Sequence, residues 1–223
     1  LEPHATGTQF TFRIPNGEVP INLKIPCRMN VYNALAAATV ATAHQINLQT
    51  IKKGLEAVSS IPGRLEIIDE GQPFTVVVDF AHTEDSLSQV LELFRELTKG
   101  RLILVFGATG NRDTLKRPKM GAAADKLCDL IVLTDDDPYT EDHRSIARMV
   151  REGINRKESD RFWQVLDRKE AIRLALALAK EGDTVLVAGK GAEEFQMVGK
   201  QHIPHDDRKV VREILGKAME IDL

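Results

Sequence analysis

The segment RLILVFGATGNRDTLKRP, residues 101–118, has the composition of an anion-binding site. Its apolar run ends in a glycine-containing loop, which predicts a buried strand followed by a helix whose free backbone amides attract anions. A dinucleotide fingerprint needs a third glycine in this loop, but Asp113 takes that position and would repel a pyrophosphate. The segment therefore favours a carboxylate or phosphate ligand over a dinucleotide. The cations that would bind it are Arg112, Lys116 and Arg117.

Carboxylates follow two further apolar runs. Asp79 ends the run FTVVVD, and a buried carboxylate is costly unless it is paired or faces a ligand, so we expect it to meet a ligand such as a sugar diol. The segment TDDDPYTED, residues 134–142, carries three consecutive aspartates that could cap a helix, bind a metal or attract a cationic substrate group. No histidine stands nearby at ligand spacing, which favours the cationic group over a transition metal.

A lysine between two glycines stands out in AGKGAEEFQ, residues 188–196. The position of Lys190 does not match the Gly-x4-Gly-Lys-Ser/Thr spacing of a phosphate-binding P-loop. The two glutamates that follow are expected to begin the next helix. Further along, HIPHDDR resembles a metal cluster, but an aspartate that caps the last helix, Asp206 or Asp207, explains it better.

Alternating strands and helices must position these residues. From residue 74 onward the pattern predicts an α/β fold, Rossmann-like, with a mostly parallel sheet covered by helices on both faces. Ligands of such sheets bind beyond the carboxyl ends of the strands. The predicted strands are 74–79, 101–106, 130–134, 162–166 and 184–188, and the predicted helices are 84–98, 115–127, 143–155, 168–180 and 207–219.

The first sixty residues follow a different plan. Residues 9–25 alternate apolar and polar positions around a Pro-Asn-Gly turn, which predicts a hairpin, and two helical patterns follow over 29–46 and 47–61. Asn30 and Asn47 are the expected N-caps. A hairpin and two helices leave apolar faces without partners, so we expect the tail of a preceding domain. The expected units are residues 1–61 and residues 62–223, with the linker near SSIPGRLE.

Composition excludes several classes of protein. A net charge of −3 gives no sign of nucleic-acid binding, and no apolar run approaches the 18 residues of a membrane span. Cys27 and Cys128 are too far apart for a redox or zinc motif, so both are expected to be reduced. With no secretion signal visible, the cytoplasm is the expected location.

Taken together and in order, six motifs resemble those of the Mur ligases, from about residue 28 to residue 215. Each motif alone is weak, whereas several with preserved spacing are specific. They most resemble the members of the family that add a diamino acid. The motifs are MNVYNALAA, PGRLE, VVVDFAHTEDSL, FGATGNRDTLKRPKMG, TDDDPYTED and AGKGAEEFQ.

This resemblance implies a C-terminal Mur ligase domain that closes over ATP held by a central P-loop domain. The implied reaction adds meso-diaminopimelate or L-lysine to UDP-MurNAc-L-Ala-D-Glu through an acyl phosphate. Residues 1–61 would be the C-terminal remnant of the central ATP-binding domain. The remaining N-terminal and central domains would supply the catalytic residues and the Mg²⁺ ligands, so we expect no catalytic or metal-binding residue here and no ligation by this chain alone.

The resemblance also implies roles for eight residues. Asn33 would meet the adenine of ATP, and Arg64 and Asp79 would meet its phosphates or ribose. The amino-acid pocket would comprise Arg112, Asp137, Tyr139, Gly189 and Glu193.

Three departures from the family pattern affect this interpretation. Tyr139 stands where the family has the arginine that binds the distal carboxylate of diaminopimelate, which raises the case for lysine or ornithine. Arg112, however, is retained. Phe80 replaces a tyrosine and Ala192 a histidine, each with the loss of a polar contact. A stand-alone Rossmann-like module that binds an amino acid or a partner is the alternative, and folylpolyglutamate synthases share the architecture.

Overall fold

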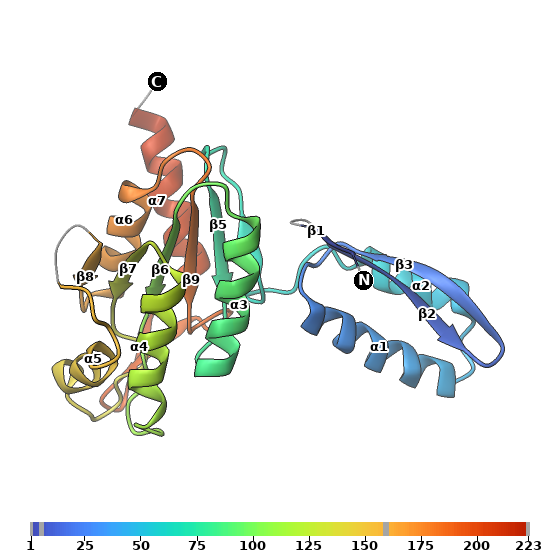
Figure 1. Cartoon of the computed structure of the whole chain (residues 1–223), viewed down its shortest axis with the longest axis horizontal. Helices are drawn as coiled ribbons and strands as arrows, with labels where there is room; N and C mark the ends of the chain where they lie inside the picture. The colour runs from blue at the N-terminus through green and yellow to red at the C-terminus, as the bar shows by residue number, and fades with distance from the viewer. Residues whose placement is uncertain (1, 5–6, 158–160, 222–223) are drawn as a thin grey trace. The chain divides into compact units, whose positions relative to one another are not determined.

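The computed structural model describes residues 2–4, 7–157 and 161–221. The chain forms two compact units, Leu1–Ile61 and Pro62–Leu223 (Figure 1). The smaller unit comes first in the chain and the larger unit carries most of the motifs.

The first unit is a small antiparallel sheet covered by two helices. β2 (Gly7–Ile14) and β3 (Gly17–Leu23) form the predicted hairpin, in which Ile14 pairs with Gly17 across the Pro-Asn turn. β1 (Glu2–His4) pairs with β2 and was not predicted. The helices are α1 (Arg28–Ala43) and α2 (Leu48–Ala57). The buried core of the unit comprises Phe12, Val19, Ile21, Leu23, Val31, Ala34, Ala38 and Ile51.

One of the two predicted helix caps is wrong. The Asn47 side chain accepts a hydrogen bond from the backbone nitrogen of Thr50 and caps α2, as predicted. Asn30 lies inside the first turn of α1, and its side-chain amide donates to the carbonyl oxygen of Pro26 at 2.7 Å. The N-cap position is Cys27. Its φ is 86°, and its side chain makes no capping hydrogen bond.

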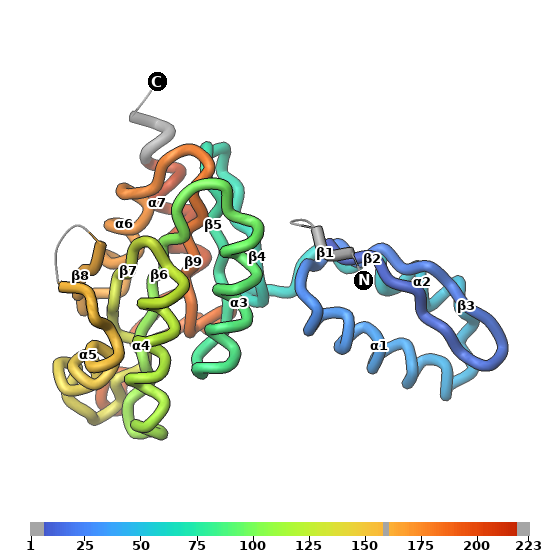
Figure 2. Tube along the Cα trace, viewed as in Figure 1, coloured from blue at the N-terminus to red at the C-terminus, as the bar shows by residue number. Residues whose placement is uncertain are grey.

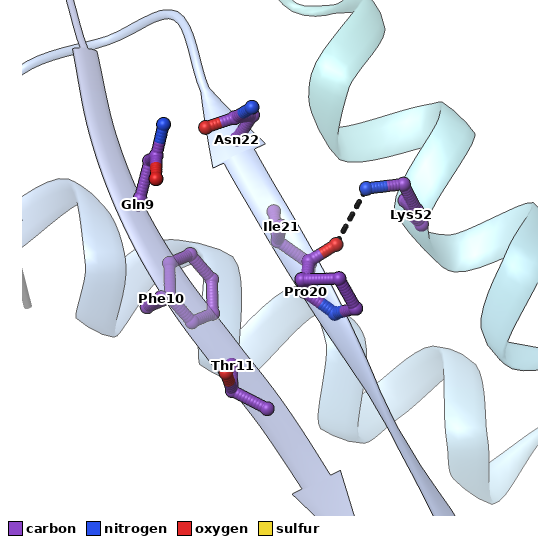
Figure 3. Close-up of a pocket in the computed structure, with 7 residues that line it drawn as sticks. All are labelled: Gln9, Phe10, Thr11, Pro20, Ile21, Asn22 and Lys52. Carbon is purple, nitrogen blue, oxygen red and sulfur yellow. Dashed lines mark hydrogen bonds between the residues drawn. The ribbon is translucent and has the colours of Figure 1, made fainter.

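Side chains of α2 cover the free edge of β3 (Figure 3). Lys52 Nζ donates to the carbonyl oxygen of Pro20 at 2.5 Å, and the backbone nitrogen of Asn22 donates to Glu56 Oε1 at 2.8 Å. Lys52 also pairs with Glu56. An unpaired strand edge is a site of aggregation, and these contacts block it. Lys52, which lines the pocket beside this edge, is therefore already paired.

The second unit is built on a six-stranded sheet in the order β4-β5-β9-β6-β7-β8. β4 runs antiparallel to β5 at one edge, and the other neighbours are parallel, which confirms the mostly parallel α/β fold (Figure 2). The short edge strand β4 was not predicted. The strands are β4 (Glu66–Ile68), β5 (Thr75–Asp79), β6 (Leu102–Phe106), β7 (Leu130–Leu133), β8 (Phe162–Gln164) and β9 (Thr184–Ala188).

Helices cover both faces of this sheet, as predicted. α6 and α7 pack on one face through a cluster of buried aliphatic side chains, and α3, α4 and α5 lie on the other (Figure 1). β6 and β9 are buried at every position, so these strands read as continuous apolar runs. The helices are α3 (Glu84–Leu97), α4 (Lys116–Leu127), α5 (His143–Arg151), α6 (Arg168–Leu178) and α7 (Asp207–Ile221).

A second hairpin follows the sheet, and it corrects one prediction. Glu193 and Glu194 do not begin a helix, because β10 (Phe195–Val198) follows them and pairs with β11 (Gln201–Pro204). The next helix is α7, which begins at Asp207. Asp206 accepts hydrogen bonds from the backbone nitrogens of the two residues after Asp207, so it caps α7 as predicted.

No group of three or more histidine, cysteine, aspartate or glutamate side chains in the described part of the chain could hold a metal ion. In the same residues, no helix is long and apolar enough to cross a membrane.

The order of the strands brings four loops together. β9 lies between β5 and β6, so the last parallel strand in the chain is inserted between the first two. The loops that follow β5, β6, β7 and β9 therefore meet at the carboxyl edge of the sheet. They are residues 80–83, 107–115, 134–142 and 189–194.

Candidate functional site

Lys190 is the centre of a buried ion-pair network at this edge. It follows β9 directly, is fully buried, and donates to Asp137 Oδ1 and to Glu193 Oε2, each at 2.8 Å. Burial alone would lower the pKa of Lys190, but the charge of Asp136 and the bonds to Asp137 and Glu193 outweigh burial and raise it. Lys190 therefore stays charged and holds two carboxylates in place.

Asp136 carries an unsatisfied oxygen. Its Oδ2 is buried without a hydrogen-bond partner among the described residues. Burial raises the pKa of Asp136, although Arg168 and Lys190 oppose the rise with their charges. Gly189 has a φ of +118°, and a Cβ at that position would lie 2.4 Å from Asp136 Oδ2. Glycine is therefore required at 189 both by its backbone conformation and by the aspartate beside it.

A second buried ion pair lies beneath these residues. Arg168 and Asp207 are both fully buried, and the guanidinium binds the carboxylate twice, Nε to Oδ1 at 2.8 Å and Nη2 to Oδ2 at 2.7 Å. Arg168 also donates to the carbonyl oxygens of Ala188 and Asp135. Burial would raise the pKa of Asp207, but the charge and hydrogen bonds of Arg168 hold it well below its usual range. The pair fixes the backbone on either side of the Lys190 network.

The β10–β11 hairpin holds the aspartate-rich loop from the other side. Gln196 Nε2 donates to the carbonyl oxygen of Asp136, and the backbone nitrogen of Met197 donates to Asp137 Oδ1. Tyr139 has a φ of 50°, a conformation that tyrosine rarely adopts. Its backbone nitrogen donates to Met197 and its carbonyl accepts from Gly199 at 2.6 Å. These bonds hold the strained residue in place.

Arg112 is a cation of the site with free donors. It is exposed, and its guanidinium carbon lies 5.5 Å from the centre of the Tyr139 ring. No hydrogen bond from this guanidinium to any described residue is present, so its donors remain available to an anion. The stacking on Tyr139 keeps the guanidinium beside the aspartate-rich loop.

Arg64 and Asp79 lie on an adjoining part of the same edge. The Arg64 guanidinium stacks on the Phe80 ring at 4.2 Å. Both Asp79 oxygens accept backbone hydrogen bonds at 2.8 Å, from Leu65 and from Ala81. Asp79 therefore shapes the loop that presents Arg64, and part of its capacity as an acceptor is already used. The loop is also tight elsewhere, since a Cβ at Gly63 would lie 2.0 Å from the backbone of Ala192.

Asn33 belongs to the first unit. It is exposed on α1 and lines a cavity of about 180 Å³ with Asn30. The other residues around the cavity are apolar, so an edge of a flat heterocycle could be buried there while the amides meet its polar atoms. The apolar lining consists of Leu23, Ile25, Ala34, Ala37, Leu55, Val58 and Ile61.

Comparison with known proteins decides the family. The sequence profile described as "Mur ligase, glutamate ligase domain" matches residues 63–191, more than half of the chain. The chain belongs to the Mur ligase family. It is 44% identical over 209 residues to the UDP-N-acetylmuramoyl-L-alanyl-D-glutamate--2,6-diaminopimelate ligase of Syntrophomonas wolfei, which covers 94% of this chain and 43% of that protein.

Solved structures agree with this assignment. A UDP-N-acetylmuramoyl-L-alanyl-D-glutamate--2,6-diaminopimelate ligase superposes with a TM-score of 0.69 at 32% identity, covering 96% of this chain and 44% of that one. A folylpolyglutamate synthase from Thermotoga maritima shares the fold, with a TM-score of 0.66 at 16% identity over 97% of this chain and 45% of that one. This Mur ligase chain thus spans less than half the length of the relatives it matches.

The site of this Mur ligase chain joins most of the residues expected from sequence. Asp137 and Glu193 both accept hydrogen bonds from Lys190, and Gly189 lies against the Asp136 carboxylate. The Arg112 guanidinium lies over the Tyr139 ring. Arg64 and Asp79 belong to the loops beside them. Asn33 lies in the other unit, and whether any of the eight residues binds a ligand stays a prediction.

Sequence reasoning missed the buried ion pairs of this Mur ligase chain. Lys190 was considered only as a P-loop lysine, and Asp207 only as a helix cap. Arg168 was not considered at all, because a single arginine at a helix start is ordinary on a surface. The usable signal was charge balance, since three consecutive aspartates at a buried edge need cations to pair with them.

Proposed function

We propose that this chain is the C-terminal part of an ATP-dependent ligase that adds a diamino acid to UDP-MurNAc-L-Ala-D-Glu through an acyl phosphate. The relatives named as diaminopimelate ligases support this, since they match almost the whole chain. The first unit would be the end of the central ATP-binding domain, and the rest of that domain would precede it. A ligase of this pathway is expected in the cytoplasm, as the resemblance implies.

One observation about the site carries the proposal. The carboxyl edge offers a cation and several carboxylates on neighbouring loops. Arg112 presents free donors on one loop, while Asp136, with an unsatisfied oxygen, and Glu193, half-exposed, provide acceptors on the neighbouring loops. A diamino acid carries both a carboxylate and ammonium groups, so a site with both charges suits it. Asp137 and Gly189 would shape this pocket around Lys190.

ATP would meet a different group of residues. Asn33, at its apolar cavity, would bind the adenine, while Arg64 and Asp79 would bind the phosphates or the ribose. The apolar lining of the cavity supports the role of Asn33, and the exposed guanidinium supports that of Arg64. ATP supplies the phosphoryl group that activates the carboxylate of the muramoyl dipeptide, and this chain's contribution would be to hold and orient the reactants.

Mg²⁺ has no proposed ligand in this chain. The described residues contain no suitable group of carboxylates, histidines and cysteines, and the 223 residues contain no P-loop motif. The metal and the compensation of charge on the transferred phosphoryl group would therefore come from the preceding part of the ligase.

Tyr139 would decide which diamino acid is added. Where a second arginine would bind a distal carboxylate ionically, Tyr139 offers a ring and one neutral hydroxyl. Arg112 would then be the main ligand of a distal carboxylate, or would be free to bind the α-carboxylate of lysine or ornithine. The relatives favour diaminopimelate and this substitution favours lysine, so both remain substrates to test.

The test is phosphate release by the full-length ligase with ATP, Mg²⁺ and the UDP-muramoyl dipeptide. Diaminopimelate, lysine, ornithine and no amino acid would be compared. We expect release that depends on one diamino acid. If no phosphate is released under any of these conditions, the proposal is contradicted. That result would favour a module that binds an amino acid or a partner without catalysing ligation.

A further inference from the structure

A third ion pair, between a fully buried arginine and a partly buried glutamate, joins two loops of the site. Arg117, in the first turn of α4, is fully buried, and its guanidinium binds the carboxylate of Glu141 twice, Nη1 to Oε1 at 2.5 Å and Nη2 to Oε2 at 2.7 Å. Nη2 also donates to the carbonyl oxygen of Thr109. A buried guanidinium is costly unless it is paired, so this charge depends on Glu141.

Glu141 also holds the backbone that precedes Arg112. Its Oε2 accepts a hydrogen bond from the backbone nitrogen of Asn111 at 2.9 Å. Asn111 has a φ of 54°, a sparsely populated conformation that needs support from its surroundings. Its side chain donates to Thr140 Oγ1 at 2.8 Å, which adds a second bond between the loops.

The same loops touch at their glycine. The backbone nitrogen of Gly110 donates to the carbonyl oxygen of Asp137 at 2.8 Å. A Cβ at Gly110 would lie 2.0 Å from the carbonyl oxygen of Pro138, so no other residue fits without a shift. Three hydrogen bonds thus join residues 110–111 to residues 137–141.

Arg112 lies next to one of these joined segments, and Tyr139 lies within the other. Arg112 directly follows Asn111, and Tyr139 comes two residues before Glu141. Arg112 has no hydrogen bond of its own to the described residues, so its position depends on the backbone before it and on the Tyr139 ring.

We propose that Glu141 and Arg117 are positioning residues that set the stacking of Arg112 on Tyr139 and thereby the end of the pocket that receives a carboxylate. This inference rests on the proposed function of the same loops. Neither residue needs to touch the substrate. Loss of the pair would let the two loops separate and would leave Arg112 without a fixed place, at a cost in binding geometry.

A matched control separates positioning from stability. Asp183 lies at the opposite edge of the sheet, where β9 begins, and its carboxylate accepts bonds from the backbone nitrogens of Arg101 and Lys180 and from the Arg101 guanidinium. Its side chain is 4% exposed. Glu141→Gln and Asp183→Asn each replace a paired carboxylate with an amide of the same size, one near the site and one far from it.

Steady-state kinetics of the full-length ligase would compare these variants. For Glu141→Gln we expect a rise of roughly tenfold in the KM for the diamino acid, with kcat and the KM for ATP changed less than about twofold. For Asp183→Asn we expect a lower Tm and an unchanged KM. Equal effects of both variants on this KM, or none from Glu141→Gln, would overturn the proposal.

A milder variant and a readout without activity complete the test. Thr140→Val removes the exposed bond to Asn111, keeps the buried pair, and should raise the same KM by a smaller factor. In the 223-residue chain, Glu141→Gln should speed hydrogen exchange at the Gly110 and Asn111 amides while the amide of Val105 is unchanged. Unchanged exchange at Gly110 and Asn111 would refute the positioning role, whereas a wild-type ligase with no amino-acid dependence would refute only the proposed function.

Discussion

Charged side chains are paired differently at the two ends of the parallel strands, the amino edge where the strands begin and the carboxyl edge where they end. At the amino edge, the charged groups are satisfied by their neighbours: Asp183 pairs with Arg101, and Asp129 accepts from the Arg95 guanidinium and from the backbone nitrogen of Leu102. At the carboxyl edge, Asp136 keeps an oxygen without a partner among the described residues. The amino edge is therefore arranged for stability, whereas the carboxyl edge keeps capacity for a ligand.

The edges also differ in backbone strain. At the carboxyl edge, Tyr139 and Asn111 are non-glycine residues with positive φ, and Gly189 adopts a φ of +118°. Such conformations persist only where surrounding contacts impose them, and they are common at functional sites. Backbone hydrogen bonds hold Tyr139, and three ion pairs, each with a fully buried cation, support the surrounding loops. The pairs are Lys190 with Asp137, Arg168 with Asp207 and Arg117 with Glu141.

The largest expected effect is at the buried support of the carboxyl edge. Arg168→Met removes the guanidinium that pairs with buried Asp207, leaves that carboxylate its hydrogen bond with His205, and removes the donors to Ala188 and Asp135. We expect the free energy of unfolding to fall by about 3–5 kcal/mol, measured by urea denaturation of the 223-residue chain. A loss below about 1 kcal/mol would show that the pair is replaceable and that the edge does not depend on it.

A glycine pair compares the edges directly. In Gly189→Ala, alanine must adopt a φ of +118°, and its Cβ would lie 2.4 Å from Asp136 Oδ2. In Gly182→Ala, at the amino edge, alanine must adopt a φ of +80°, but no atom lies nearer than 3.9 Å to its Cβ. Gly182→Ala should cost about 1–2 kcal/mol of stability from backbone strain alone, and Gly189→Ala should cost clearly more. Equal losses on denaturation would mean that the contact with Asp136 is relieved without cost.

The smallest effect is on the pH dependence of stability. The hydrogen bonds from Arg117 hold the pKa of Glu141 at about 2, against an ordinary value of 4.5. The pair therefore contributes fully above the unfolded pKa, and its contribution is lost as pH falls from about 4.5 through 2. We expect wild type to be more stable than Glu141→Gln at pH 6, with the difference shrinking as pH falls toward 2. A difference that stays constant would contradict this ionisation.

Sequence pattern determined more of the scaffold than of the site. The five parallel strands, β5 to β9, could be predicted because each lies in an apolar run between helical patterns, and their carboxyl ends had to meet at one edge. β4 and the β10–β11 hairpin could not, since their residues other than Ile68 are exposed or half-buried and form no continuous apolar run.

The candidate site was predictable in position and less so in its contacts. Arg112, Tyr139 and Glu193 could be chosen from the family resemblance, and the strand ends before them predicted where they lie. The partners of Asp137 could not be predicted, because Lys190 is 53 residues away in sequence. Asp79 shows the same limit. Its place at a strand end suggested a ligand, whereas its two oxygens accept from the backbone of Leu65 and Ala81. Long-range pairing of charges follows from the fold and leaves little trace in local sequence.

The most direct test of the account is the KM of the full-length ligase for its diamino acid after Arg112→Ala. We infer that Arg112, a cation with free donors at the carboxyl edge, binds a carboxylate of the incoming amino acid. We therefore expect a KM raised at least tenfold with the KM for ATP unchanged, because the charged donor is lost from one substrate only. An unchanged KM for the diamino acid, or an equal rise for ATP, would contradict the assignment of this edge to the amino acid.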